Sequence, residues 1–98
     1  NEADKPANRK DKRKQEAEQR KQLQPLKKVM DKQEQKLEKL TKLTADLEKS
    51  LADPDIYTEA NKAALKALLL KKRDLDAEIE VVEIAWMEAS EEYEQAMC

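Results

Sequence analysis

The sequence predicts an all-α fold: an antiparallel two-helix coiled-coil hairpin with a basic N-terminal arm. Two leucine-rich runs each carry apolar residues at alternating steps of three and four, which is the heptad spacing of helices that pack along a seam. Between the runs lies one short turn, LADPDIYT at residues 51–58, and the chain contains no glycine. Helices joined by so short a turn bury their apolar stripes most simply by folding back on each other.

Composition favours two long helices over a globular core. Charged residues make up 43% of the 98 residues and aromatic residues 3%, with no phenylalanine, so a wide apolar core is excluded. The apolar residues recur with a period, which argues against disorder. We expect one domain or less, and a fragment of a longer protein, because the chain starts at Asn1 without a methionine. No run of 18 apolar residues and no signal-peptide core is present, so we expect no membrane segment.

The first part, residues 1–24, is predicted to be a basic and partly helical lead-in arm. Asn8 is a suitable N-cap for its helix. The arm has no apolar stripe before Leu23, so we expect a frayed helix, with Asn1–Ala7 disordered. Pro25 removes a helical hydrogen bond and clashes with the preceding turn, so the helix is predicted to kink or restart there.

Residues 25–98 form the predicted hairpin, with its turn at 52–58. Asp53 before Pro54 is a helix stop, and Thr58 is predicted to cap a second helix that runs from about Glu59 to Met97. The seam of the first helix is predicted at Leu23, Leu26, Met30, Gln33, Leu37, Leu40, Thr44, Leu47 and Leu51. The seam of the second helix is predicted at Leu65, Leu68, Lys72, Leu75, Ile79, Val82, Trp86, Ala89, Tyr93 and Ala96.

The pairing of the two helices is predicted by folding the chain about the middle of the turn, so that partner numbers sum to about 110. This places Trp86 near Leu23 and Gln24, and it places Lys72, a polar residue of the seam, near Glu38. Lys72 has two interpretations: a buried catalytic or anion-binding lysine, or a packed stem whose ammonium reaches Glu38 or water. We favour the second.

Charge is distributed unevenly along the chain. Residues 1–28 contain ten Lys or Arg and five Asp or Glu, whereas residues 74–98 contain nine Asp or Glu and no Lys or Arg. The formal net charge of −2 therefore conceals a basic arm and an acidic second helix.

The basic arm is a candidate contact for a phosphate backbone. The candidate residues are Arg9, Lys10, Lys12, Arg13, Lys14, Arg20, Lys21, Lys27 and Lys28. For the last four the sequence leaves two interpretations open, because they either contact phosphate or answer Glu83 and Glu88 across the hairpin. The cluster at residues 9–14 is instead predicted to project past Cys98, without acidic partners. No aromatic residue is interleaved with it, so base stacking and sequence readout are not expected.

Leu70 is a candidate protein contact. Leu68 belongs to the predicted seam and Leu69 to its flank, so Leu70 faces away from the partner helix. An exposed leucine of this kind either has no role or marks a surface on which another molecule docks.

Catalytic and metal chemistry have no support in the residue content. The chain has no histidine and no glycine, and its single cysteine, Cys98, fits a reducing compartment. Nucleophile–histidine pairs, His/Cys metal sites and glycine-rich phosphate loops are therefore excluded within it. The acidic run Glu91, Glu92 and Glu94 lacks the loop geometry of a calcium site and is interpreted as a solvated helix face. We expect no active site, no cofactor and no metal in this chain.

The sequence resembles the C-terminal helical extension of ABC-F ATPases of the Uup/YheS type. The features that carry the resemblance are the basic lead-in RKDKRKQEAEQRKQ, the step QPLKK at residues 24–28, the turn LADPDIY at residues 51–57, and Trp86 in the acidic second helix. Together they cover nearly the whole chain.

The resemblance implies a non-catalytic accessory domain that follows the second ATPase domain of a cytoplasmic protein. It implies contact with nucleic acid, either ribosomal RNA or DNA, or with the ribosome, through the basic arm. ATP and Mg would belong to the ATPase domains of the longer protein. The alternative is a structural or protein-interaction coiled coil that docks or dimerises without nucleic acid, and we expect a monomer or a weak homodimer.

Overall fold

Two long helices account for most of the chain. The computed structural model describes residues 6–97, and the side chains of residues 9–97. Helix α1 spans Pro6–Ala52 and helix α2 spans Lys62–Met97, and between them lie two short 3₁₀ turns, η2 (Pro54–Tyr57) and η3 (Glu59–Asn61). Residues 6–97 contain no strand. The all-α prediction is confirmed.

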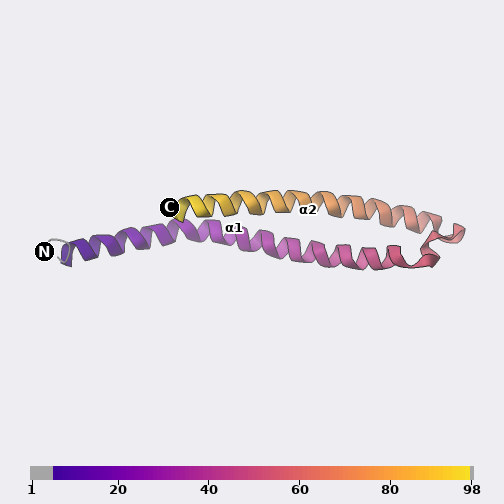
Figure 1. Ribbon diagram of the computed structural model, residues 1–98, viewed down its shortest axis with the longest axis horizontal. Coiled ribbons are helices and arrows are strands. Elements are labelled where there is room, and N and C mark those ends of the chain that lie inside the picture. Colours follow the sequence, from indigo (N-terminus) through magenta and orange to yellow (C-terminus); the bar gives the residue numbers. More distant parts are fainter. Residues whose placement is uncertain (1–5, 98) are drawn as a thin grey trace.

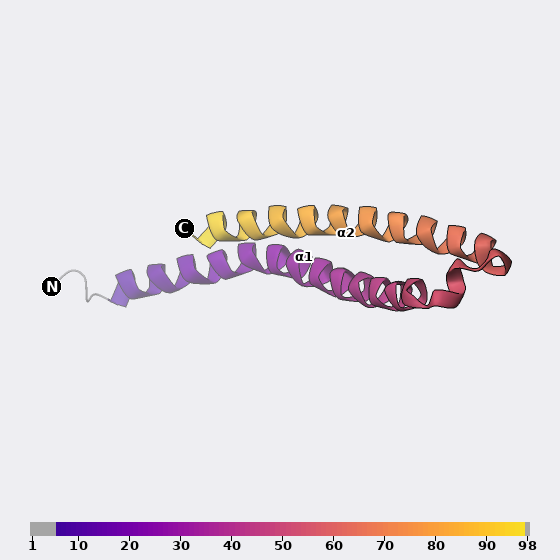
Figure 2. The same ribbon diagram turned by 45° about the vertical axis from the view of Figure 1, so that its right-hand side comes forward.

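The molecule is a thin rod. Helix α2 lies beside α1 and returns along it from the turn, as two views of the ribbon show (Figures 1 and 2). The Cα radius of gyration is 23.6 Å and the principal extents are 84 × 16 × 15 Å. A compact domain of this length would have a radius of gyration of about 13 Å. The cross-section therefore has room for two helices and one seam of side chains between them.

The seam runs along the positions that the heptad spacing predicts. In α1, the half-buried and buried residues among positions 9–52 are those at Leu23, Leu26, Met30, Gln33, Leu37, Leu40, Thr44, Leu47 and Leu51. In α2 every predicted seam residue is at least half-buried, and Ala85 and Ser90 are covered as well. The predicted seam is confirmed.

The best-buried side chains are spaced by seven residues in each helix. Leu40 and Leu47 of α1 are 7% and 5% exposed, and they form one cluster with Leu75 and Val82 of α2, at 7% and 6%. Full burial of one such side chain contributes about 1.5–3 kcal/mol. With so few buried residues, each one carries a large share of the stability of the rod.

The turn is held by local hydrogen bonds. Asp53 is the N-cap of η2, where its Oδ1 accepts a hydrogen bond from the Asp55 backbone N at 3.0 Å, and Pro54 takes the first position of the turn. The Tyr57 hydroxyl donates to the Leu51 carbonyl at 2.6 Å, which fastens the turn to the end of α1. The predicted helix stop at Asp53 and the short turn after it are confirmed.

The predicted start of the second helix at Glu59 is wrong. Residues 59–61 form η3, and α2 begins at Lys62. Thr58 is the N-cap of η3, but its side chain makes no capping bond there. Its hydroxyl donates backward to the Asp55 carbonyl at 2.9 Å, where the amide of Asn61 also donates at 2.9 Å. The single carbonyl of Asp55 thus holds the chain in a second tight turn before the helix starts.

The expected features of the N-terminal helix are wrong in two respects. The chain is already helical at Pro6, so Asn8 is not an N-cap, and residues 6–7 of the expected disordered stretch belong to α1. Residues 1–5 of that stretch lie outside the described part of the chain. Proline suits the first turn of a helix because the backbone N–H that it lacks has no helical partner there.

The helix also does not restart at Pro25, which lies inside α1. A proline in a helix interior forfeits one hydrogen bond, and the neighbouring turns carry the helix onward with a change of direction. Both ribbon views show α1 changing direction gently along its length, without a break (Figures 1 and 2).

The predicted register is wrong by several residues. The Gln19 side-chain amide donates to the Ala96 carbonyl at 3.2 Å, and the Trp86 indole N–H donates to Glu34 Oε1 at 3.0 Å. These partner numbers add to 115 and 120 rather than 110, so Trp86 does not cover Pro25. The reason is the second 3₁₀ turn, because α2 starts later in the sequence than a single turn would allow.

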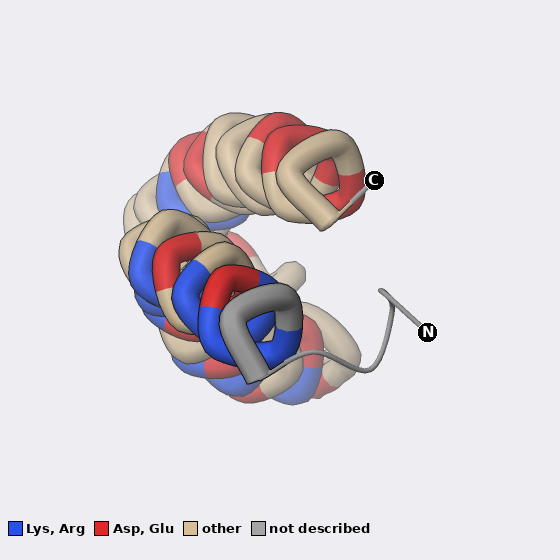
Figure 3. The backbone as a smooth tube through the Cα atoms, turned by 90° about the vertical axis from the view of Figure 1, so that its left-hand side faces the viewer, with Lys and Arg blue, Asp and Glu red and all other residues tan. Residues whose placement is uncertain are grey.

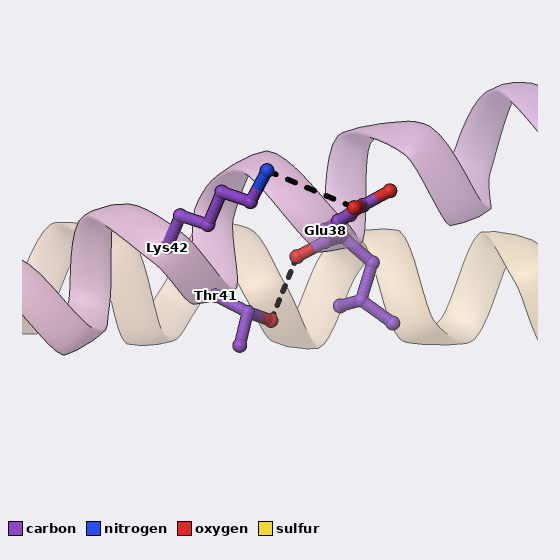
Figure 4. Close-up of polar contacts among 4 residues, drawn as sticks. Glu38, Thr41 and Lys42 are labelled. Carbon is purple, nitrogen blue, oxygen red and sulfur yellow. Dashed lines mark hydrogen bonds and ion pairs between the residues drawn. The ribbon is translucent and has the colours of Figure 1, made fainter.

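Lys72 does not reach Glu38 either. Lys72 Nζ lies 3.9 Å from Asp76 Oδ2 of its own helix. Glu38 is paired at 3.8 Å with Lys42, one turn further along α1, beside the hydrogen bond from the Thr41 hydroxyl to the Leu37 carbonyl (Figure 4). The favoured interpretation of Lys72, a packed stem with an exposed ammonium, agrees with its half-buried side chain. The predicted partner Glu38 is wrong, because the carboxylate beside the ammonium belongs to Asp76 of the same helix.

Candidate nucleic-acid interface

The first part of α1 extends beyond the end of α2. The Gln19 amide lies within hydrogen-bonding distance of the carbonyls of both Ala96 and Met97, at 3.2 and 3.4 Å, so the last described turn of α2 sits beside Gln19. Helix residues 6–18 therefore lie past it (Figures 1 and 2). At 1.5 Å per residue this overhang is about 20 Å long.

All nine candidate cations lie on α1, and all are exposed. Because α1 is one unbroken helix, successive residues turn by about 100° and their directions can be compared along its length. Eight of the nine fall into two adjacent rows. The first row is Arg9, Arg13, Arg20 and Lys27, and the second is Lys10, Lys14, Lys21 and Lys28.

The two rows together form a surface that we call the cationic face. It occupies an arc of about 140° and its rows repeat every seven residues from Arg13 onward. The seam residues Leu23 and Leu26 lie on the other side of α1 from the second row, which is turned away from α2, whereas the first row flanks the seam. It is about 29 Å long from Arg9 to Lys28.

The acidic residues of the same stretch lie outside the cationic face. Asp11 and Glu18 border its second row, and Glu16 borders its first row on the seam side, toward Lys12. Lys12 is therefore the candidate that the helix separates from the other eight. Figure 3, which looks along the rod from the N-terminal end, shows blue Lys and Arg together with some red Asp and Glu on the near part of α1, and red and tan residues without blue on the near part of α2.

The alternative role of the inner cations, as partners of Glu83 and Glu88, does not take the form of an ion pair within 4 Å. Among residues 9–97 the ion pairs within 4 Å are Lys42–Glu38 and Lys72–Asp76, and both lie within one helix. Arg20 Nε donates to the Glu16 carbonyl at 3.4 Å.

One aromatic side chain lies beside the cationic face, which the sequence reasoning missed. Tyr93 of α2 lines a small hollow of about 210 Å³ together with Leu23, Gln24, Arg20 and Lys27. The expectation that no aromatic residue is interleaved with the cluster at residues 9–14 is unaffected, because Tyr93 lies beside Arg20 and Lys27. The correct register would have revealed Tyr93. When the numbers of facing residues add to about 115, Tyr93 lies opposite Gln22 and Leu23.

Leu70 lies at the other end of the rod, as predicted on the outer surface of α2. It is 52% exposed and Leu69 beside it is 51% exposed. The two leucines line an open hollow of about 790 Å³ together with Glu59 and Ala60 of η3 and with Lys62, Ala63, Leu65, Lys66 and Arg73 of α2. The structure thus separates the candidate protein contact from the inner end of the cationic face by about half the length of α2.

The described residues form neither a metal-binding cluster nor a membrane-spanning helix. Within residues 6–97, no group of three or more Cys, Asp or Glu side chains is arranged to hold a metal ion, and this includes the run Glu91, Glu92 and Glu94. No helix of the described part is long and apolar enough to cross a membrane.

Comparison with known proteins finds one kind of relative. The chain is 38% identical over 89 residues to the "Probable ATP-binding protein YheS" of Escherichia coli strain K12, and equally to that of Escherichia coli O157:H7. The match covers 91% of this chain and 14% of the relative, so the chain spans about one seventh of the length of the curated relatives it matches. No family model matches the sequence, and no solved structure matches it.

Proposed function

The chain is homologous to a segment of YheS, an ABC-F ATP-binding protein, and from this we propose that it is a non-catalytic accessory domain of such a protein that contacts nucleic acid through its cationic face. The homology confirms the resemblance to the ABC-F family. A match to 14% of the relative is consistent with a C-terminal domain. ATP and Mg would then be bound by the ATPase domains of the longer protein, which we place in the cytoplasm.

The proposed architecture is an antiparallel coiled-coil hairpin. Its support is the heptad seam shared by the two helices, with Leu40 and Leu47 packed on Leu75 and Val82. The Gln19 and Trp86 hydrogen bonds join the helices at two further points. In this architecture the two paired helices form a rigid support, from which the overhanging part of α1 projects toward a partner.

The cationic face carries the proposal of nucleic-acid contact. Eight side chains of one sign lie on one side of a continuous stretch of helix, with no carboxylate between the two rows. A duplex carries one negative charge per about 1.7 Å of its axis, so a cationic surface about 29 Å long can meet many phosphates at once. Such contacts favour ribosomal RNA or DNA by charge and not by base sequence.

A second candidate function is a structural or protein-interaction coiled coil that uses no nucleic acid. One observation favours it: the exposed apolar side chains on the outer surface of α2, Leu69, Leu70, Val81, Ile84 and Met87, are each at least half exposed. A surface of this kind marks a docking site more often than isolated exposed leucines do.

Binding to a fluorescently labelled duplex, followed by anisotropy over a range of salt concentrations, tests the first function. If all eight cations of the face contact phosphates, the slope of log K against log salt is about −7 for DNA, and fewer contacts lower it by about 0.9 each. The variant Arg9→Gln, Lys10→Gln, Arg13→Gln, Lys14→Gln is expected to weaken binding and to reduce the slope by up to about 3.6.

The matched control removes four charges from the same helix, on the C-terminal side of the cationic face. The variant Lys32→Gln, Lys36→Gln, Lys39→Gln, Lys49→Gln changes the net charge equally, and all four lysines are exposed on α1. It should keep most of the affinity and the slope. Absence of binding by the intact chain at 50 mM salt, or equal losses in the two variants, would overturn the proposed contact.

A further inference from the structure

Helix α2 carries a second apolar stripe on the side opposite the seam. Its members are Ala63, Ala67, Leu70, Asp74, Ala77, Val81 and Ile84, at steps of three and four, and Asp74 is the single polar member. Val81 is 66% exposed, Leu70 52% and Ile84 50%. We call these seven residues the outer stripe. Nothing within residues 6–97 covers it, because α1 packs on the other side of α2.

The outer stripe is a property of α2 and not of the rod as a whole. The corresponding outward positions of α1 from residue 28 onward are Lys28, Lys32, Gln35, Lys39, Lys42, Asp46 and Lys49, and all are polar. A solvated coiled-coil surface is expected to look like that of α1. The apolar outer stripe therefore indicates a partner.

The charge along α2 changes sign in the middle of the outer stripe. Residues 62–73 contain five Lys or Arg and no Asp or Glu, and residues 74–94 contain nine Asp or Glu and no Lys or Arg. A partner of one sign would match only one half of this surface. A second copy of α2 that runs in the opposite direction would present acid to base and base to acid along the whole outer stripe.

We propose that the outer stripe is the interface with a second copy of this chain, in which the two α2 helices pack in opposite directions about a two-fold axis. The apolar members of the outer stripe meet one another, and Asp74 meets a small residue, when partner numbers across the interface add to about 151. Leu70 then faces Val81 of the second copy, Ala67 faces Ile84, and Asp74 faces Ala77. The symmetry repeats each of these pairs on the other side of the axis.

The flanking charges of the outer stripe agree with this register. Lys71 and Arg73 lie on its two sides, and in the second copy Glu78 and Glu80 lie opposite them. All four side chains are exposed in the single chain. Each pair occurs twice in a two-fold dimer, so four attractive charge pairs frame the apolar contact. The proposal uses no residue of the cationic face, and it stands or falls independently of nucleic-acid binding.

The dimer is expected to be weak. The outer stripe is one helix face about 32 Å long from Ala63 to Ile84. We therefore expect it to bury less area than the standard interface of about 1,200–2,000 Å². Asp74 also brings two carboxylates close to the axis. We expect a dissociation constant on the order of 10–100 µM.

Sedimentation velocity on the 98-residue chain from about 1 µM to 1 mM measures this equilibrium. Ile84→Glu is expected to weaken the dimer at least about tenfold, because it buries a charge in the interface. The control Leu43→Glu alters a side chain of α1 that is 47% exposed and should leave the constant unchanged. Asp74→Ala is expected to tighten the dimer, a result that a misfolded variant cannot produce.

A charge exchange tests the opposite direction of the two helices. The variant Lys71→Glu, Arg73→Glu and the variant Glu78→Lys, Glu80→Lys should each be monomeric alone, because their own flanking charges repel. An equimolar mixture should form a heterodimer at least as tight as the original dimer. A chain that is monomeric up to about 1 mM, or a mixture that stays monomeric, would overturn the proposal.

Discussion

Replacing Leu47 by alanine removes one of the best-buried side chains of the seam. Leu47 is 5% exposed and belongs to the cluster with Leu40, Leu75 and Val82. A buried leucine shortened to alanine costs about 2–5 kcal/mol, and the open sides of a two-helix seam let the cavity partly collapse, so we expect about 2–3 kcal/mol. For a chain of this size each kcal/mol lowers Tm by about 4–8 °C, which gives a fall of about 10–20 °C.

Leu43→Ala is the matched control for this substitution. Leu43 lies one turn earlier in the same helix and is 47% exposed, so the change in helix propensity is identical and only the burial differs. We expect it to cost less than about 1 kcal/mol. Circular dichroism at 222 nm during heating and during urea titration measures both variants. Equal and small losses for Leu47→Ala and Leu43→Ala would refute a shared seam, and with it the proposed hairpin.

Two further substitutions test the irregular parts of the rod. Pro25→Ala should raise Tm and helix content, because the helix already runs through this position and alanine restores the missing backbone N–H. Proline inside a helix costs up to about 3 kcal/mol relative to alanine. A fall in Tm would mean that the packing of the two helices depends on the bend. Tyr57→Phe removes the 2.6 Å hydrogen bond to the Leu51 carbonyl and should cost about 1 kcal/mol in urea unfolding, and an unchanged midpoint would show that this bond does not fasten the turn.

The two proposed surfaces lie in different parts of the rod. The cationic face begins in the overhang of α1, whereas the outer stripe is centred between Asp74 and Ala77 of α2. In the proposed dimer the two-fold axis near Leu75 would place the two cationic faces toward opposite ends, with the overhang of each α1 beyond a Met97 that is about 32 Å from the axis. Such a dimer would hold two separate polyanion segments apart rather than grip one of them.

The sequence by itself determined which residues are buried and where the chain turns. The steps of three and four select the same face of each helix whatever the partner is, and the structure covers every residue at those steps from Leu23 to Ala96. Asp53 and Pro54 end the first helix through a local hydrogen bond and the missing N–H of proline, neither of which needs a distant contact. The outer stripe also follows from the sequence, because its members recur at steps of three and four, but only Leu70 among them was named as a candidate contact.

Only the tertiary structure decided the register, the continuity of α1 and the neighbours of the cationic face. The heptad repeat fits equally well when one helix slides by seven residues, so the pairing of Gln19 with Ala96 depended on the second 3₁₀ turn before Lys62. Whether Pro25 breaks the helix depended on the packing on both sides of it. Local pattern fixes the face that a helix buries, whereas the length and shape of the connection fix which residues of the other helix it meets.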